Sequence, residues 1–265
     1  MISSHHEDGS FFVPLYAYEI RRKQNMNCKT KKQTLEKEFL KDFVIIKHIP
    51  HASLEVPEDF KSEYPYNTAQ FQEYNLKMSD VGVDRLFIDL PGIEIKAKYT
   101  RLFCDVERFK GPKIEPMEKL GMGYNYCKYY DGVEIHKPSM IRGMDTRKIV
   151  EEYYDDYHFK LNQIVRKLFD EGKSILLLDI HSYSDDLANA LGKKGSYPDI
   201  CLGVEEGYYS KELLDAIILE IKKRNLSYQI NFPYAGSLLP SDVIQGKIKG
   251  KIYSIMIEIN KRIYL

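Results

Sequence analysis

Residues 174–182 read SILLLDIHS, and this stretch decides the fold that the sequence predicts. Its unbroken apolar run, Ile175–Leu178, is typical of a strand at the centre of a sheet that is covered on both faces. The alternation of strands and helices around it predicts an α/β fold whose central sheet is mixed, mostly parallel and flanked by helices. The other expected strands are residues 43–46, 93–99, 102–106, 200–204 and 253–259, and the expected helices are residues 79–90, 145–170 and 208–223.

The composition excludes several classes of protein. The chain has 265 residues, with 39 Lys and Arg against 39 Asp and Glu, so it lacks the basic surplus of a nucleic-acid-binding protein. A hydrophobic content of 43% provides for a large core and argues against a disordered chain. No apolar run approaches the roughly 20 residues of a membrane span. The cysteines are scattered, and we expect Cys104 and Cys201 to be buried and reduced. We therefore expect a soluble, cytoplasmic protein with no nucleic-acid or membrane partner.

The first part of the chain differs from the rest. Basic residues are concentrated at residues 21–32, and the first strong core signal begins only at Phe43. We therefore expect an N-terminal extension at residues 1–42 and one large domain at residues 43–265.

Histidines occur where two expected strands end. His48 and His51 follow the first strand, His181 follows the central strand, and Glu258 lies near the end of the last strand. Ligand sites of α/β sheets gather beyond the carboxyl ends of the strands, so we expect these side chains to lie together. Imidazole is the commonest protein ligand of zinc, and a catalytic zinc usually has three protein ligands and a water. The pattern favours a metal-dependent hydrolase.

The third metal ligand is open from spacing alone. Asp80 is the preferred candidate, although it could instead cap a helix. Asp84 is the second candidate because it would share a helix face with Asp80, and Glu55 in the loop after the first strand is the third. Asp179 lies two residues before His181, on the same face of the strand, where it can accept a hydrogen bond from a metal-bound imidazole.

Charged residues beside these segments suggest further roles. Glu258 interrupts the apolar run of residues 255–259, and a buried carboxylate needs a partner or a shifted pKa. We interpret Glu258 as a general base; a salt bridge to Arg262 is the structural alternative. Arginine binds carboxylates in a bidentate manner, so Arg101, Arg108 and Arg262 could hold an acidic substrate. The chain contains no H-E-x-x-H, G-x-S-x-G, P-loop or G-x-G-x-x-G motif.

Eight short motifs occur in a fixed order from about residue 43 to the C-terminus. They are IPHAS at 49–53, SDVGVDRLF at 79–87, RLFCDVER at 101–108, Tyr154 through His158, LDIHS at 178–182, PDICLG at 198–203, Asn231 through Gly236, and IEINKR at 257–262. Each motif is weak alone, but their order is specific. Together they resemble the N-formylglutamate amidohydrolase family.

The resemblance implies a fold, a reaction and a set of residue roles. The fold is a phosphorylase/hydrolase-like three-layer sandwich, related to that of the zinc carboxypeptidases. The reaction is hydrolysis of the amide bond of an acidic N-acyl amino acid such as N-formylglutamate. It uses one divalent metal ion, for which zinc is the preferred candidate. The implied metal ligands are His51, Asp80 and His181, and Glu258 is the implied base. In the mechanism that we expect, Arg101 stabilises the oxyanion, and the substrate-binding residues are Arg108, Arg262, Asn231 and Tyr234.

Glu107 departs from the family pattern, which has Asn immediately before Arg108. In the family this Asn–Arg pair helps to bind the substrate carboxylate, so Glu107 adds negative charge beside the expected anion pocket. Three alternatives follow from the sequence. The chain could be a carboxypeptidase-like metallo-amidase acting on another N-acyl amino acid or a peptide, a metal-dependent phosphoesterase, or a non-enzymatic family member acting as a binding module.

Overall fold

A six-stranded sheet forms the centre of the molecule. The computed structural model describes residues 43–110 and 115–265, so the expected N-terminal extension lies outside the described residues. The strand order is β2-β1-β5-β8-β6-β7, and every neighbouring pair is parallel except β6 and β8. This confirms the mixed, mostly parallel sheet. The strands are β1 (Phe43–Ile49), β2 (Ile93–Lys96), β5 (Ser174–Tyr183), β6 (Ile200–Val204), β7 (Tyr228–Ile230) and β8 (Ile252–Asn260).

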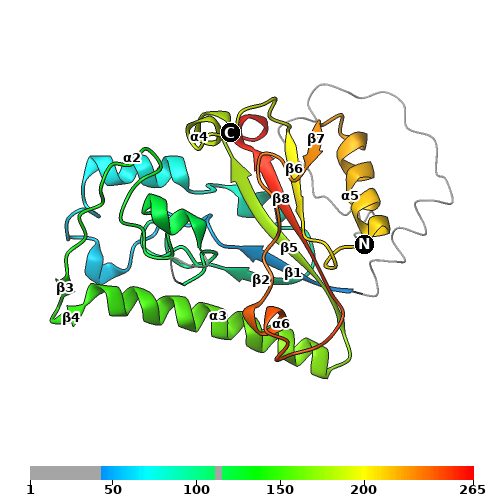
Figure 1. Ribbon diagram of the computed structural model, residues 1–265, viewed down its shortest axis with the longest axis horizontal. Helices are drawn as coiled ribbons and strands as arrows, with labels where there is room; N and C mark the ends of the chain where they lie inside the picture. Colours follow the sequence, from blue (N-terminus) through cyan, green and yellow to red (C-terminus); the bar gives the residue numbers. More distant parts are fainter. Residues whose placement is uncertain (1–42, 111–114) are drawn as a thin grey trace, which may run out of the picture.

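Helices cover both faces of the sheet, which gives the three-layer sandwich (Figure 1). The long helix α3 (Thr146–Asp170) packs on one face, and α5 (Lys211–Lys223) packs with η3 (Val83–Phe87) on the other. The remaining elements are η2 (Glu58–Phe60), α2 (Ala69–Met78), η4 (Pro116–Leu120), a small hairpin of β3 (Met140–Ile141) and β4 (Met144–Asp145), α4 (Asp185–Ala190), α6 (Ser241–Ile244) and η5 (Lys261–Ile263).

The two faces of the central strand carry different residues. In β5, Leu176 and Leu178 pack toward α5, whereas Ile175 and Leu177 pack toward α3. Successive side chains of a strand alternate between faces, so Asp179 continues the row on the α3 side beyond Leu177. The polar residues at the ends of the central strands therefore emerge together, at one edge of the sheet.

The expected strand at residues 102–106 is wrong. These residues are buried but lie in turns, because Thr100 directs the chain away from an extended path. Its carbonyl accepts hydrogen bonds from the amides of Phe103 and Cys104, and its hydroxyl accepts one from the amide of Leu102. An apolar composition indicated burial correctly, but here the buried segment is a compact turn.

The expected helix at residues 79–90 is also wrong. The structure has only the short 3-10 helix η3, and Asp80 lies in the loop before it. Gly82 precedes η3 with a φ of 81°, a left-handed conformation that interrupts any helix running through this segment. Asp80 and Asp84 therefore do not share a helix face.

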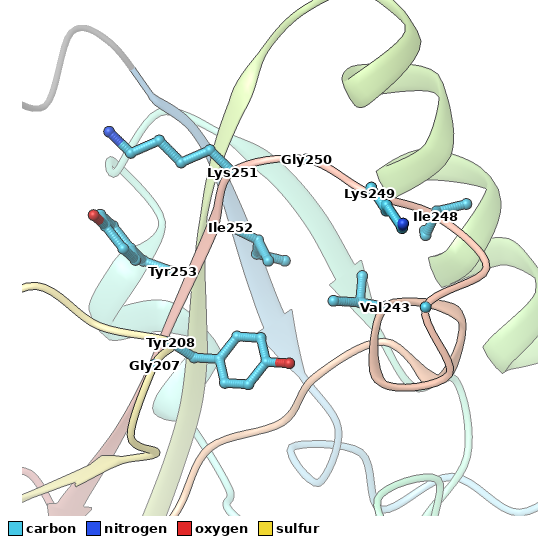
Figure 2. Close-up of a pocket in the computed structure, with 10 residues that line it drawn as sticks. Gly207, Tyr208, Val243, Ile248, Lys249, Gly250, Lys251, Ile252 and Tyr253 are labelled. Atoms are coloured by element: carbon cyan, nitrogen blue, oxygen red, sulfur yellow. The ribbon is translucent and has the colours of Figure 1, made fainter.

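A pocket with a volume of about 350 Å³ lies at the start of β8, away from the edge of the sheet at which the polar residues emerge (Figure 2). Tyr208, Val243, Ile248 and Ile252 are among the residues that line it, and its lining contains no histidine and no carboxylate. Ile252 begins β8 and Glu258 lies near its end, which separates them by roughly 20 Å at the usual rise of a strand.

Among residues 43–110 and 115–265 we also find no helix with the length and apolar character of a membrane span.

We expect Leu178→Ala to lower the free energy of unfolding by about 2–5 kcal/mol, because it leaves a cavity in the fully buried centre of β5. Leu76→Ala is the matched control. Because Leu76 is 57% exposed on α2, its substitution should lower the free energy of unfolding by about 0.5 kcal/mol or less. Denaturant unfolding measures both. An equal loss in the two variants would contradict the packing described here.

Candidate metal centre and active site

The ring of His51 is held in one orientation by a buried carboxylate. His51 lies in the loop directly after β1, and its Nε2 is 2.8 Å from Asp105 Oδ1. This contact places the ring proton on Nε2 and leaves the lone pair on Nδ1. Burial lowers the pKa of His51, so the imidazole stays neutral. Its Nδ1 faces His181 Nδ1 at a distance of 3.3 Å.

His181 is surrounded by carboxylates. Its Nε2 lies 3.0 Å from Asp179 Oδ1 and 3.1 Å from Glu107 Oε1, as the shared strand face of Asp179 and His181 predicts for the first contact. Burial alone would lower the pKa of His181, but the negative charges of Glu107 and Asp179 and its hydrogen bonds raise it well above its ordinary value. Asp179 is itself held by the amide of Leu238, which donates to Oδ2.

Asp80 completes a triangle with the two histidines. Its Oδ2 is 3.2 Å from His181 Nδ1 and 3.7 Å from His51 Nδ1. Its Oδ1 accepts a hydrogen bond from Ser182, and its amide donates to the carbonyl of His51. The charge of His181 and its hydrogen bond lower the pKa of Asp80 despite burial, which alone would raise it.

The C-terminal residues fix the loop that carries Asp80. Lys261 donates from Nζ to the carbonyl of Ser79, and the Tyr264 hydroxyl donates to the carbonyl of Val81. The two residues thus hold the backbone on either side of Asp80, although they are more than 180 positions away in the chain.

The other two candidates for the third ligand lie elsewhere. Asp84 pairs with Lys96, and Glu55 is an exposed side chain 3.6 Å from Lys61. Of the three carboxylates considered from the sequence, the structure brings only Asp80 to the histidines.

The three donor atoms are spaced like the ligands of one metal ion. A tetrahedral ion with bonds of about 2.0–2.1 Å has donors about 3.3 Å apart. The observed separations among His51 Nδ1, His181 Nδ1 and Asp80 Oδ2 are 3.3, 3.2 and 3.7 Å. A metal ion that replaced the Nδ1 proton of His181 would face the lone pairs of both Nδ1 atoms, because Asp105, Asp179 and Glu107 hold the other ring protons on Nε2. The donor set therefore fits a divalent ion such as zinc.

Asp105 is the most densely bonded side chain of the site, and sequence reasoning gave it no role. It is fully buried, and its two oxygens accept hydrogen bonds from His51, Arg101, Tyr126 and the amide of Glu107. Burial alone would raise the pKa of Asp105, but the charge of Arg101 and the contact with His51 hold it well below its usual range. Its position four residues after Arg101 was the only signal available in the sequence.

Glu258 is a buried carboxyl without a complete set of partners. It pairs with His181 in the register of β5 and β8, and its Oε2 has no hydrogen-bond partner. Burial raises the pKa of Glu258 to about 8. The structural alternative from the sequence was a salt bridge between Glu258 and Arg262. Among the described residues Arg262 pairs with Asp185 and Asp199 instead.

The structure separates the residues expected to bind substrate into two groups. Arg108 lies beside the site, with its Nε 3.6 Å from Asp105 Oδ2 and without a hydrogen-bond partner. Arg262 is engaged at the surface by Asp185 and Asp199, at 3.1 and 2.9 Å. The structure therefore brings Arg108, and not Arg262, to the cluster.

Asn231 and Tyr234 come from the turn that follows β7. The Asn231 side chain is used to fix this turn, since it bonds both backbone groups of Val204 and the amide of Gly236. The Tyr234 carbonyl accepts from the thiol of Cys201, a buried free cysteine as expected. Burial raises the pKa of Tyr234, and the charge of Glu258 contributes in the same direction.

A second set of donors adjoins the first. His48 Nδ1, Asp179 Oδ1 and Glu107 Oε1 lie within 4.8 Å of one another. The His48–Asp179 distance is 2.8 Å, which is the length of an ordinary hydrogen bond to a ring N–H. Glu107 also approaches His51, with its Oε2 3.7 Å from Nδ1. Its carboxylate is therefore turned inward toward the histidines.

The fold and this site together are typical of an α/β hydrolytic enzyme with its polar groups at the carboxyl edge of the sheet. The family model for N-formylglutamate amidohydrolase matches residues 43–265. The chain therefore belongs to the N-formylglutamate amidohydrolase family, hydrolases that act on amide bonds.

Solved structures support the fold. The N-formylglutamate amidohydrolase from Ralstonia eutropha JMP134 is similar with a TM-score of 0.63 and 20% identity, over 83% of this chain and 82% of that one. The gene product Atu2144 from Agrobacterium tumefaciens is similar with a TM-score of 0.56 and 17% identity, over 84% and 82%. A search among curated proteins finds no match to this chain.

We expect Arg101→Met to lower the free energy of unfolding by about 3–5 kcal/mol, because it leaves the buried charge of Asp105 without its cation. Arg262→Met is the control, since its exposed pairs with Asp185 and Asp199 should contribute about 1 kcal/mol or less. Chemical denaturation measures both. A larger loss of unfolding free energy for Arg262→Met than for Arg101→Met would contradict the greater contribution of the buried pair.

We expect Glu258→Gln to stabilise the protein in the presence of a metal chelator. The folded-state pKa of Glu258 is raised to about 8 from 4.5, so the folded protein binds this proton more tightly than the unfolded chain. The contribution of Glu258 to the stability of the unsubstituted protein therefore falls as the pH rises from 4.5 to about 8. The stability gain of the variant should be about 1–3 kcal/mol larger at pH 9 than at pH 6, measured by urea unfolding. A gain that does not change with pH would refute the shifted pKa.

Proposed function

We propose that the protein is a metal-dependent amidohydrolase, with zinc as the first candidate, that cleaves the amide bond of an N-acyl amino acid. The observation that carries the proposal is the triangle of His51 Nδ1, His181 Nδ1 and Asp80 Oδ2 next to the buried, incompletely bonded carboxyl of Glu258. Family membership supports the hydrolysis of an amide bond, and the donor set supports the metal.

The residues around the triangle prepare it for a cation. A divalent ion bound there supplies a Lewis acid that polarises a carbonyl and lowers the pKa of a water molecule. Asp105 keeps the proton of His51 on Nε2, and Asp179 and Glu107 do the same for His181. Hydrogen bonds of this kind fix the orientation of the rings and raise the basicity of the free nitrogens.

Glu258 is the proposed proton carrier. Its carboxylate accepts a proton from the attacking water and then donates it to the leaving nitrogen. A pKa raised by burial suits both steps, because the group is a stronger base than an exposed glutamate and still gives up its proton near neutral pH.

Positive side chains are assigned to the substrate and the oxyanion. We propose that Arg108 binds the substrate carboxylate, because it lies at the site with an unused Nε–H. Arg101 donates from Nε and Nη2 to Asp105 and from Nη1 to the carbonyl of Met78, and the N–H groups that these bonds leave unused are assigned to the oxyanion. Substrate-binding roles for Arg262, Asn231 and Tyr234 remain predictions.

The second donor set is the specific observation in favour of a two-metal phosphoesterase. The contacts from Asp179 Oδ1 to His48 and to His181 measure 2.8 and 3.0 Å, and each is an ordinary hydrogen bond when the ring nitrogen carries a proton. The set thus acts as support for one metal ion, and the amidohydrolase remains the preferred function.

We expect Glu258→Gln to reduce kcat for N-acyl amino acid hydrolysis by at least about a hundredfold while the protein still binds one equivalent of zinc. The reason is that the amide cannot accept the proton, whereas the three metal donors are unchanged. Metal content is measured by atomic emission and turnover by release of the free amino acid.

His181→Ala is the reciprocal variant, and it should lose both the metal and the activity. Turnover that survives in Glu258→Gln would remove the proposed base. Full metal content in both His51→Ala and His181→Ala would remove the proposed ligands.

A further inference from the structure

The charges around the site restrict the charge that a substrate can carry. Five carboxyl groups and three arginine or lysine side chains lie in and around the cluster, so an additional negative group on a substrate needs a cation that is free to meet it. The carboxylates are Asp80, Asp105, Glu107, Asp179 and Glu258, and the cations are Arg101, Arg108 and Lys261.

Two of the three cations are already engaged. Arg101 donates to Asp105 through Nε and Nη2, at 3.2 and 2.7 Å, and to the carbonyl of Met78. Lys261 donates its Nζ to the carbonyls of Lys77 and Ser79. Both side chains therefore hold parts of the site in place.

Arg108 is the remaining cation at the cluster within the part of the chain that the structure describes. Its Nε is buried and has no hydrogen-bond partner, and its nearest carboxylate, Asp105, is 3.6 Å away. A guanidinium binds one carboxylate in a bidentate manner. The described residues thus provide one receptor for a substrate carboxylate.

Glu107 places a fixed carboxylate at the cluster, next to Arg108 in the chain. It directly precedes Arg108, and its side chain is only 16% exposed. Its two oxygens lie 3.1 Å from His181 Nε2 and 3.7 Å from His51 Nδ1, so its charge is fixed beside the metal donors. At the low effective dielectric constant of such a site, a like charge on the substrate is repelled strongly.

We infer that Glu107 makes this site selective for N-acyl amino acids with one carboxylate and an uncharged side chain, and against dicarboxylates such as N-acylglutamate. The inference rests on the proposed function, which gives the substrate class as N-acyl amino acids. It adds the charge that the side chain of such a substrate can carry.

A matched pair of substrates tests it. N-formylglutamine and N-formylglutamate have nearly the same shape and differ by one charge. The zinc-loaded enzyme should show a kcat/KM about tenfold or more higher for the glutamine compound. Equal values, or a preference for N-formylglutamate, would overturn the inference and leave the proposed function intact.

Binding separates this inference from the proposed function. Titration calorimetry of zinc-loaded Glu258→Gln with the same two compounds should give a Kd about tenfold or more lower for N-formylglutamine. If neither compound is hydrolysed but this ratio holds, the proposed function fails and the charge selectivity stands. Equal Kd values would overturn the selectivity.

Glu107→Gln tests the residue itself. The variant keeps the shape of the side chain and removes its charge, so the glutamine-to-glutamate ratio of kcat/KM should fall toward one. Taking the ratio cancels any effect on metal binding or folding that both substrates share. Glu134→Gln is the control, because Glu134 is an exposed carboxylate paired with His136, and it should leave the ratio unchanged. A ratio that stays high in Glu107→Gln would overturn the role of Glu107.

Discussion

The hydrogen bond between His51 Nε2 and Asp105 Oδ1, 2.8 Å long, is the contact on which the arrangement of the site depends. It selects the tautomer that turns the His51 Nδ1 lone pair toward His181. Asp105 can serve this purpose only as an anion, and an anion buried this deeply requires Arg101. Arg101 in turn donates to the carbonyl of Met78, at the end of α2 and just before the loop of Asp80. One chain of contacts therefore links two of the three proposed metal ligands.

Like charges are held together here at a cost in stability. Burial opposes the ionisation of Asp80, Asp105 and Asp179, and each carboxyl remains ionised because a histidine or an arginine lies beside it. Glu258 has no such partner at Oε2, and its pKa rises. The carboxyl proposed to move a proton is thus the one whose negative charge the fold does not balance with a cation, as expected where function conflicts with stability.

The sequence predicted the parts of the site that depend on strand ends. His51, His181 and Glu258 were brought together correctly, because parallel strands in one sheet place their carboxyl ends at one edge. Asp105 was missed because its segment is apolar and was interpreted as a strand, whereas Thr100 folds it into turns that aim the carboxylate at His51. Such long-range contacts leave no periodic signal in the sequence.

Glu107 shows how one residue joins two properties that are usually separate. Its sequence position suggested a charge facing the substrate, but the carboxylate points at His181 and His51 and thereby also supports the proposed metal ligands. An amide at this position would keep a hydrogen-bond acceptor for His181 Nε2 and remove the negative charge. The charge tolerated in a substrate and the basicity of the His181 ring are therefore set by the same side chain. A chain with glutamate at this position is expected to differ from one with asparagine in both properties at once.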